Sequence, residues 1–204
     1  MTNLFGIEIT DEQVDNIIAY MENNAQPYEG RVLTYEEWEK EFAPDMRIKT
    51  PIGTVKLGEN QFAKMYNAGR DSKFGMIKPT LQSPDIIVTS ESKPKPGKPA
   101  ERDFSYVYVK SFVGKDGKRI YRFTSVTNLI DGIEISISNQ EKSAGRIKRL
   151  IKSGKLVYIK SATMPSTPAS IAHGSQPTVR GGGTSRAKVT KKSKQAKSKA
   201  KKSK

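Results

Sequence analysis

The sequence predicts an α+β domain in which short N-terminal helices precede an antiparallel β-sheet, followed by a basic helix near the C-terminus and a disordered Lys-rich tail. Three observations support this fold class. Two amphipathic segments open the chain, three runs rich in Val, Ile, Tyr, Phe and Thr are separated by Asp-Gly pairs, and Lys repeats with Ser and Ala at the end. Asp-Gly between apolar runs is a strong hairpin signal, so residues 104–139 predict a three-stranded meander.

Two helices are expected in the first 45 residues. Thr10–Gln13 and Thr34–Glu37 both have the form of a capping box, apolar residues follow each box at helical spacing, and Pro44 stops the second helix. This segment holds two basic and eleven acidic residues, a net charge of −9. Three interpretations stay open for it: docking on the basic middle of the chain, a remnant of a longer precursor, or a solvated extension.

Shorter elements are expected before the meander. Pro79 fixes its own backbone and restricts Lys78, which favours a constrained turn around them. In order, the sequence predicts a hairpin over Ile48–Leu57, a helix over Glu59–Ala68, this turn over Gly75–Leu81, a strand over Ile86–Thr89 and a mobile Pro- and Lys-rich loop over Ser92–Arg102.

The two Asp-Gly turns fix the register of the meander. The first sets Tyr108 opposite Ser125, and the second sets Thr127 opposite Ser136 and Ser125 opposite Ser138. Because side chains alternate along a strand, one face collects Val and Ile and is assigned to the core. The other face is aromatic, rich in hydroxyls and carries a lysine; its members are Tyr106, Tyr108, Lys110, Phe112, Tyr121, Phe123, Ser125, Thr127, Ser136 and Ser138.

The aromatic and polar face has two interpretations. Tyr and Phe are common strand residues, so a second layer of helix or loop can cover them. Buried hydroxyls and a buried lysine each need a partner, however, which favours an open face that binds a ligand.

A basic helix and a last strand are expected after the meander. The helix runs over Gln140–Ser153, Gly154 ends it, and the strand runs over Lys155–Ile159. Its basic residues point outward: Lys142, Arg146, Lys148, Arg149 and Lys152. The predicted domains are therefore an acidic helical extension over residues 1–45, the α+β domain over 46–160 and the tail over 161–204.

Charge and composition favour a polyanionic partner. The net charge is +15, with +13 over residues 46–160 and +11 over the tail, which has no acidic residue. A basic tail of this kind neutralises nucleic-acid phosphates without reading sequence. No apolar run approaches the length of a membrane span, so a cytosolic protein is expected.

Several kinds of chemistry have no support in the sequence. There is no cysteine, the single histidine, His173, lies in the tail, and Gly181–Gly183 has no strand and helix around it. No metal or cofactor is expected. Cationic, hydroxyl and aromatic side chains on one strand face suit RNA, which carries its own nucleophile in the 2′-OH, and a lysine can stabilise the charge at the phosphate without a metal.

Short blocks between Ile48 and Lys160 resemble the phage-associated branch of the barnase, EndoU, colicin and RelE (BECR) nuclease superfamily. The blocks are Thr50–Gly53, Gly58–Asn60, Phe74–Thr80, Pro84–Asp85, Val109–Phe112, Phe123–Thr127, Ile137–Asn139 and Gly154–Leu156. The resemblance implies an RNA-cleaving toxin or effector of phages and mobile elements, with helices preceding a sheet whose open face binds RNA. The missing histidine departs from the barnase and EndoU types.

The resemblance points to Lys78, Thr80, Lys110, Ser125 and Thr127 as catalytic residues. Lys110 would stabilise the phosphate charge, Lys78 would contact a second phosphate or transfer a proton, and the hydroxyls would orient the substrate. Solvated turn lysines, local turn bonds and ordinary strand propensity explain the same residues without catalysis. The residues expected to bind RNA are Arg70, Tyr106, Tyr108, Arg146, Lys148 and Arg149.

The sequence thus predicts a metal-independent endoribonuclease. Two alternatives are a non-catalytic nucleic-acid-binding protein of a phage particle or mobile element and a nuclease-derived fold kept for protein contacts. Expected partners are RNA, DNA through the tail, an inhibitor protein and phage-particle proteins. The expected location is the bacterial cytoplasm, with packaging in a virion as a further option.

Overall fold

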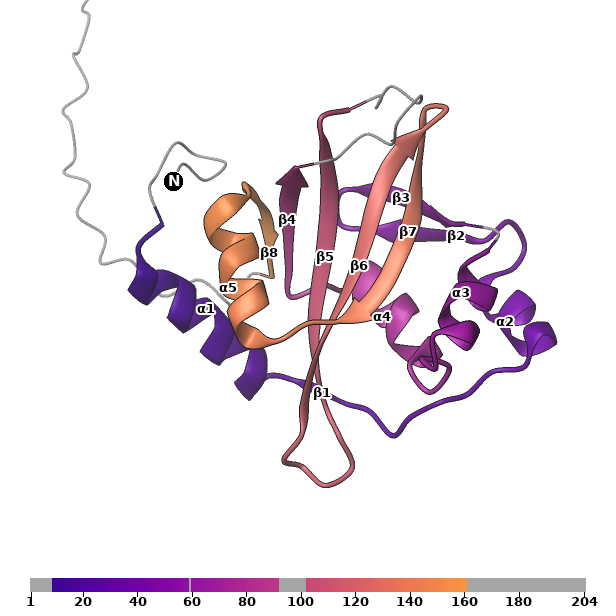
Figure 1. Ribbon diagram of the computed structural model, residues 1–204, viewed down its shortest axis with the longest axis horizontal. Helices are drawn as coiled ribbons and strands as arrows, with labels where there is room; N and C mark the ends of the chain where they lie inside the picture. The colour runs from indigo at the N-terminus through magenta and orange to yellow at the C-terminus, as the bar shows by residue number, and fades with distance from the viewer. Residues whose placement is uncertain (1–8, 59, 92–101, 161–204) are drawn as a thin grey trace, which may run out of the picture. The chain divides into compact units, whose positions relative to one another are not determined.

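The predicted α+β class is confirmed by a computed structural model, which describes residues 9–58, 60–91 and 102–160. Most of the predicted loop over 92–102 and all of the predicted tail lie outside these residues. The described part forms five α-helices and a short 3₁₀ helix around a curled mixed sheet (Figure 1). The helices are α1 (Asp11–Asn23), α2 (Tyr35–Phe42), α3 (Gln61–Asn67), η1 (Phe74–Met76), α4 (Ile77–Gln82) and α5 (Ala144–Ser153).

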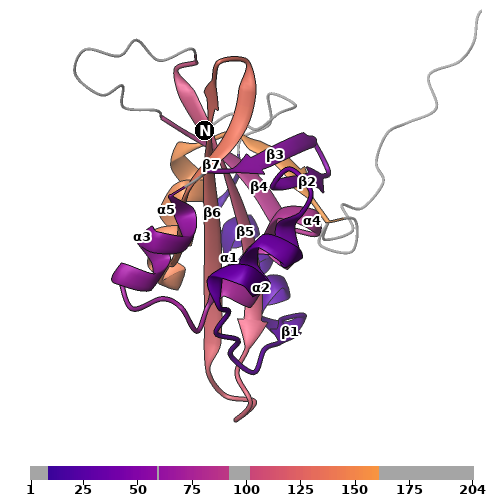
Figure 2. The same ribbon diagram turned by 90° about the vertical axis from the view of Figure 1, so that its right-hand side faces the viewer.

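The sheet has eight strands in the described part of the chain. Seven of them follow the order β2-β3-β7-β6-β5-β4-β8, and the eighth, β1, pairs with β5 off this path. Neighbouring strands are antiparallel except that β3 runs parallel to β7, and β1 runs parallel to β5 off the main path. Figure 2 shows β1 beside one end of β5. The strands are β1 (Gln26–Pro27), β2 (Arg47–Thr50), β3 (Gly53–Leu57), β4 (Ile86–Glu91), β5 (Phe104–Val113), β6 (Ile120–Ile130), β7 (Ile133–Glu141) and β8 (Leu156–Ile159).

The β5–β6 pairing has the predicted register. Lys110 lies opposite Phe123, and Tyr108 lies opposite Ser125. The turn between these strands centres on Asp116-Gly117, and Gly117 has a φ of 65°, a left-handed conformation that glycine adopts without strain. The Asp-Gly turn therefore positions every side chain on the two longest strands.

The β6–β7 pairing follows the prediction only near its turn. Thr127 lies opposite Ser136 as expected, but Ser125 lies opposite Asn139 rather than Ser138. A β-bulge between Val126 and Thr127 causes the difference, because the bulge adds one residue to one strand and shifts the pairing beyond it.

Both faces of the sheet are covered, which corrects the prediction of an open polar face. In Figure 1, α1 and α5 lie on one side of the long central strands and α2, α3 and α4 on the other. Helices α1 and α5 pack on the predicted core face; this cluster includes Val14, Ile17, Ile18, Met21, Val107, Val109, Ile147 and Ile151. The opposite, aromatic face packs against the other helices in a cluster that includes Trp38, Phe42, Met65, Phe74, Met76, Leu81, Tyr108, Phe112 and Phe123.

The N-terminal helices belong to this packing rather than to a solvated extension. Both predicted capping boxes are present, with Thr10 and Thr34 as the N-caps. Val14 of α1 is fully buried, and Trp38 and Phe42 of α2 are nearly so. Residues 9–45 thus dock on the rest of the fold, one of the three interpretations that the sequence left open for this segment.

Two predicted elements differ in kind or extent. The expected constrained turn over Gly75–Leu81 is helical, because Pro79 falls in the first turn of α4, where its missing N–H needs no acceptor. The basic helix begins at Ala144 rather than Gln140, since β7 continues to Glu141 and Ser143 caps the helix.

The turn between α5 and β8 depends on a close backbone contact. A Cβ on Gly154 would lie 1.9 Å from the carbonyl oxygen of Thr89 in β4, whereas a Cβ on Gly145 of α5 would meet nothing within 4 Å. A side chain at residue 154 therefore pushes the α5–β8 turn away from β4.

We expect Gly154→Ala to lower the free energy of unfolding by about 3 kcal/mol, because a backbone carbonyl cannot move aside without shifting β4. Gly145→Ala should instead raise it by about 0.5–1 kcal/mol, since alanine favours the helix. Urea denaturation of the two variants measures both changes. Equal stability of the two would contradict the close contact.

Candidate functional site

Lys110, the residue proposed to act at the phosphate, is buried. Its side chain is only 6% exposed, and its Nζ donates a hydrogen bond to the carbonyl oxygen of Ser83 at 2.6 Å. The Asp85 carboxylate lies 3.9 Å from the same Nζ. Burial lowers the pKa of Lys110, and Asp85 opposes that shift. The lysine therefore holds two internal partners and does not face solvent.

The predicted sheet hydroxyls are buried as well. Ser125 and Thr127 have no exposed surface. The Ser125 hydroxyl lies 3.1 Å from that of Ser136, and the Thr127 hydroxyl donates to the carboxylate of Glu134. Each hydroxyl thus has an internal partner, so the polar residues do not require an open face.

Lys78 and Thr80 also make internal contacts. The Nζ of Lys78 donates to the carbonyl oxygen of Glu41 at 2.9 Å and lies 3.3 Å from its carboxylate, at the end of α2. Thr80 is fully buried and donates to the carbonyl oxygen of Met76, one helical turn earlier. Lys78 and Lys110 therefore have separate partners, and Thr80 makes the local bond that needs no catalytic role.

The two tyrosines expected to stack bases do not form a platform. Tyr108 is 1% exposed, its hydroxyl lies 3.3 Å from that of Thr50, and burial raises its pKa to about 12. Tyr106 is half-buried beneath the guanidinium of Arg102, which lies 4.4 Å from the ring centre. The aromatic face of the sheet is a core.

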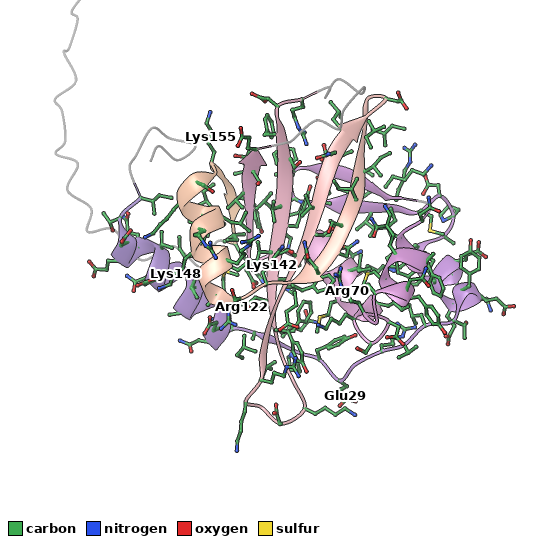
Figure 3. All side chains as sticks on the ribbon, viewed as in Figure 1. Glu29, Arg70, Arg122, Lys142, Lys148 and Lys155 are labelled. Carbon is green, nitrogen blue, oxygen red and sulfur yellow. The ribbon has the colours of Figure 1, made fainter. Side chains whose placement is uncertain are left out.

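The basic residues of α5 separate into two flanks. Lys148 and Lys152 form ion pairs with Asp15 and Asp11 of α1. The bond from Lys152 lowers the pKa of Asp11. The two lysines are four residues apart on α5, and the two aspartates are four residues apart on α1, so the two helices meet along matching faces. Figure 3 places Lys148 on the side of α5 that faces α1.

The opposite flank of α5 carries cations that are not neutralised in this way. Lys142, Arg146 and Arg149 form no ion pair with any acidic residue in the described part of the chain. They line a hollow of about 350 Å³ between α5 and strands β4, β5 and β6. Its apolar lining comes from Val107, Val126 and Leu150, and its remaining lining from Ser90, Glu91, Ser105 and Ser153.

A fourth cation extends this surface. Burial is the main cause that lowers the pKa of Lys142. The positive charges of Arg146 and Arg70 lower this pKa further, so both guanidinium groups act on the ammonium. Arg70 is held by a hydrogen bond to the carbonyl oxygen of Asn139 at 3.3 Å. We call Arg70, Lys142, Arg146 and Arg149 the cationic track. Figure 3 shows Lys142 where the chain passes from β7 to α5, with Arg70 to its right.

The track contains three of the residues that the sequence predicted to bind RNA. Arg146 and Arg149 line the hollow together, and the charge of Arg70 acts on Lys142 beside them, whereas Lys148 lies on the neutralised flank of α5. Sequence reasoning placed Lys142 on the outside of the helix but did not assign it to a site. Its signal is its position directly before the N-cap residue Ser143, which leaves it at the junction of strand and helix.

Comparisons of this chain with protein-family models, curated proteins and solved structures find no match. No helix within the described ranges is both long enough and apolar enough to cross a membrane. Among the same residues, no three His, Cys, Asp or Glu side chains are grouped to hold a metal ion.

The burial of Lys110 gives a prediction about stability. Lys110→Met removes the cation that lies 3.9 Å from the buried Asp85 carboxylate, so we expect the free energy of unfolding to fall by about 3 kcal/mol. In the double variant with Asp85→Asn, the amide still accepts from the backbone N–H of Ser111 and carries no charge. Urea denaturation should show that the double variant regains at least about 1 kcal/mol; no recovery would mean that the pair is not coupled.

Proposed function

We propose that this protein binds nucleic acid through the cationic track without cleaving it. The single observation that supports this is the separation of charge on α5. One flank is neutralised by α1, and the other leaves Lys142, Arg146 and Arg149 around a hollow without an ion pair to a described acidic residue. Uncompensated cations gathered at one surface attract polyanions.

The residue types suit phosphates. Arg146 and Arg149 lie three residues apart on a helix, so both guanidinium groups project from the same flank. A guanidinium presents a planar fork of donors that matches phosphate oxygens, and Lys142 adds a point charge beside it. Arg70 continues the charge beyond the hollow, which suits a ligand with more than one phosphate.

Binding of this kind is largely independent of base sequence. Phosphate contacts set the position of a nucleic acid but do not identify its bases. RNA is the first candidate because the sequence resembles RNA-cleaving proteins, and DNA is the alternative. The basic tail adds charge of the same sign, and a role in a phage particle or mobile element is part of the proposal.

Endoribonuclease activity remains a prediction of the resemblance, as does a BECR-like description of the fold. Helices before a largely antiparallel sheet agree with that description in outline. The residues assigned to cleavage do not support it, because Lys110, Ser125 and Thr127 are buried and internally bonded. We therefore favour a nuclease-like fold used for binding.

Replacing two arginines of the track tests the proposal. In the full-length protein, Arg146→Gln with Arg149→Gln should weaken binding of a single-stranded RNA at least about tenfold at low salt. The slope of log affinity against log salt should fall by about 1.4, because two phosphate contacts are lost. Fluorescence anisotropy across a salt series measures both quantities.

The matched control changes two cations on the other flank of the same helix. Lys148→Gln with Lys152→Gln removes the same formal charge and leaves the tail intact, but these lysines already pair with α1. We expect a smaller loss of affinity and an unchanged salt slope. Equal losses in the two double variants would show that total charge, rather than the track, governs binding.

RNA integrity tests the other half of the proposal. Total RNA incubated in EDTA with the full-length protein should stay intact, because Lys110, Ser125 and Thr127 are buried and have no access to a substrate. Gel electrophoresis of the RNA measures this. Cleavage by the parent protein that the double arginine variant abolishes would replace the binding role with a catalytic one at the track.

A further inference from the structure

The hollow beside α5 combines two kinds of surface. Its apolar part consists of Val107 and Val126 from the sheet and Leu150 from α5. The cations of the track stand beside this apolar part. A ligand that fits both has a flat apolar portion and an anionic portion, as a nucleotide has in its base and its phosphate.

Hydrogen bonds within the protein decide which groups remain for a ligand. The Ser105 hydroxyl donates to Asn128, and the Ser153 hydroxyl donates to the carbonyl oxygen of Arg149 at 2.8 Å. Ser90 makes no side-chain hydrogen bond to another described residue, so its hydroxyl can donate to a ligand.

Arg149 is partly held in place and still has free donors. Its Nε donates to the carbonyl oxygen of Gly145 at 3.3 Å, which orients the guanidinium. The two terminal nitrogens are left for a phosphate, since no other described residue accepts from them. A guanidinium that is already oriented loses less conformational freedom when it binds.

The size of the hollow limits its occupant. A volume of about 350 Å³ lies near the lower end of ligand pockets in proteins. One nucleotide unit suits such a volume, whereas an internal segment of a duplex offers no unit that can enter. The hollow therefore favours a nucleotide at the end of a single strand.

The charge around the hollow favours a terminal phosphate over an internal one. Lys142, Arg146 and Arg149 bring three positive charges to one small volume. An internal phosphodiester carries one negative charge, whereas a phosphomonoester carries about −1.5 to −2 at neutral pH. The dianion compensates the mutual repulsion of these cations more completely.

We propose that the hollow binds the phosphorylated end of a single-stranded nucleic acid, with the phosphomonoester against Lys142, Arg146 and Arg149 and the terminal base on the apolar lining. This inference rests on the proposed function and narrows its ligand. Glu91, at the end of β4, also lines the hollow. Its carboxylate can accept a hydrogen bond from a sugar hydroxyl or a base amino group, and its negative charge disfavours a second phosphate on that side of the hollow.

Three oligonucleotides of one sequence test the inference. One carries a 5′-phosphate, one a 3′-phosphate, and one has hydroxyls at both ends. We expect the full-length protein to bind one phosphorylated form about tenfold more tightly than the hydroxyl form, as charge-assisted bonds to one extra dianion allow. Fluorescence anisotropy measures the ratio, and the preferred end gives the polarity of the bound strand.

Single variants assign that ratio to the hollow. Arg149→Gln and Arg146→Gln should each bring the ratio close to one, whereas Lys148→Gln, on the neutralised flank of α5, should keep it. Both arginines are exposed, so the variants should melt at the temperature of the parent protein in circular dichroism. A ratio that survives in both arginine variants overturns the inference.

Other outcomes separate this inference from the proposed function. Equal affinity for all three oligonucleotides overturns the end preference and leaves nucleic-acid binding intact. Failure of the parent protein to bind any of them overturns both. A nucleoside monophosphate that binds as tightly as the phosphorylated oligonucleotide would show that a free nucleotide occupies the hollow, which overturns the assignment to a strand end.

Discussion

The pairing of β5 with β6 determines most of what surrounds it. Its register places Val107 and Val109 on one face and Tyr108 and Phe112 on the other, so both faces are apolar and both require a cover. Helices α1 and α5 cover the valine face, and α2, α3 and α4 cover the aromatic face. Once Ile147 turns inward to reach the valines, the basic residues of α5 have to project along its two flanks.

The local parts of this arrangement could be predicted from the sequence because short-range rules determine them. Capping boxes at Thr10 and Thr34 begin α1 and α2, and Asp116-Gly117 sets the register of the long hairpin. The β-bulge beside Val126 could not be predicted, since no glycine or proline marks it. The cover over the aromatic face was the less favoured of two interpretations, because it depends on contacts between residues far apart in the chain.

The polar face of the sheet can be buried because the fold supplies internal partners for its buried groups. Ser136 is the partner of Ser125, Glu134 of Thr127 and the Ser83 carbonyl of Lys110. Paired in this way, buried polar groups are compatible with a core and can help to specify its arrangement. The polar face that suggested catalysis is thus consistent with a structural network.

The contact between α1 and α5 has an electrical consequence for the molecule. Lysines on one flank of α5 are already paired with acidic side chains of α1, whereas the arginines on the other flank are not paired with a described acidic residue, so the positive charge of this helix is one-sided. Attraction of an anion is therefore strongest on the unpaired flank. The acidic start of the chain thus gives the charge of α5 a direction.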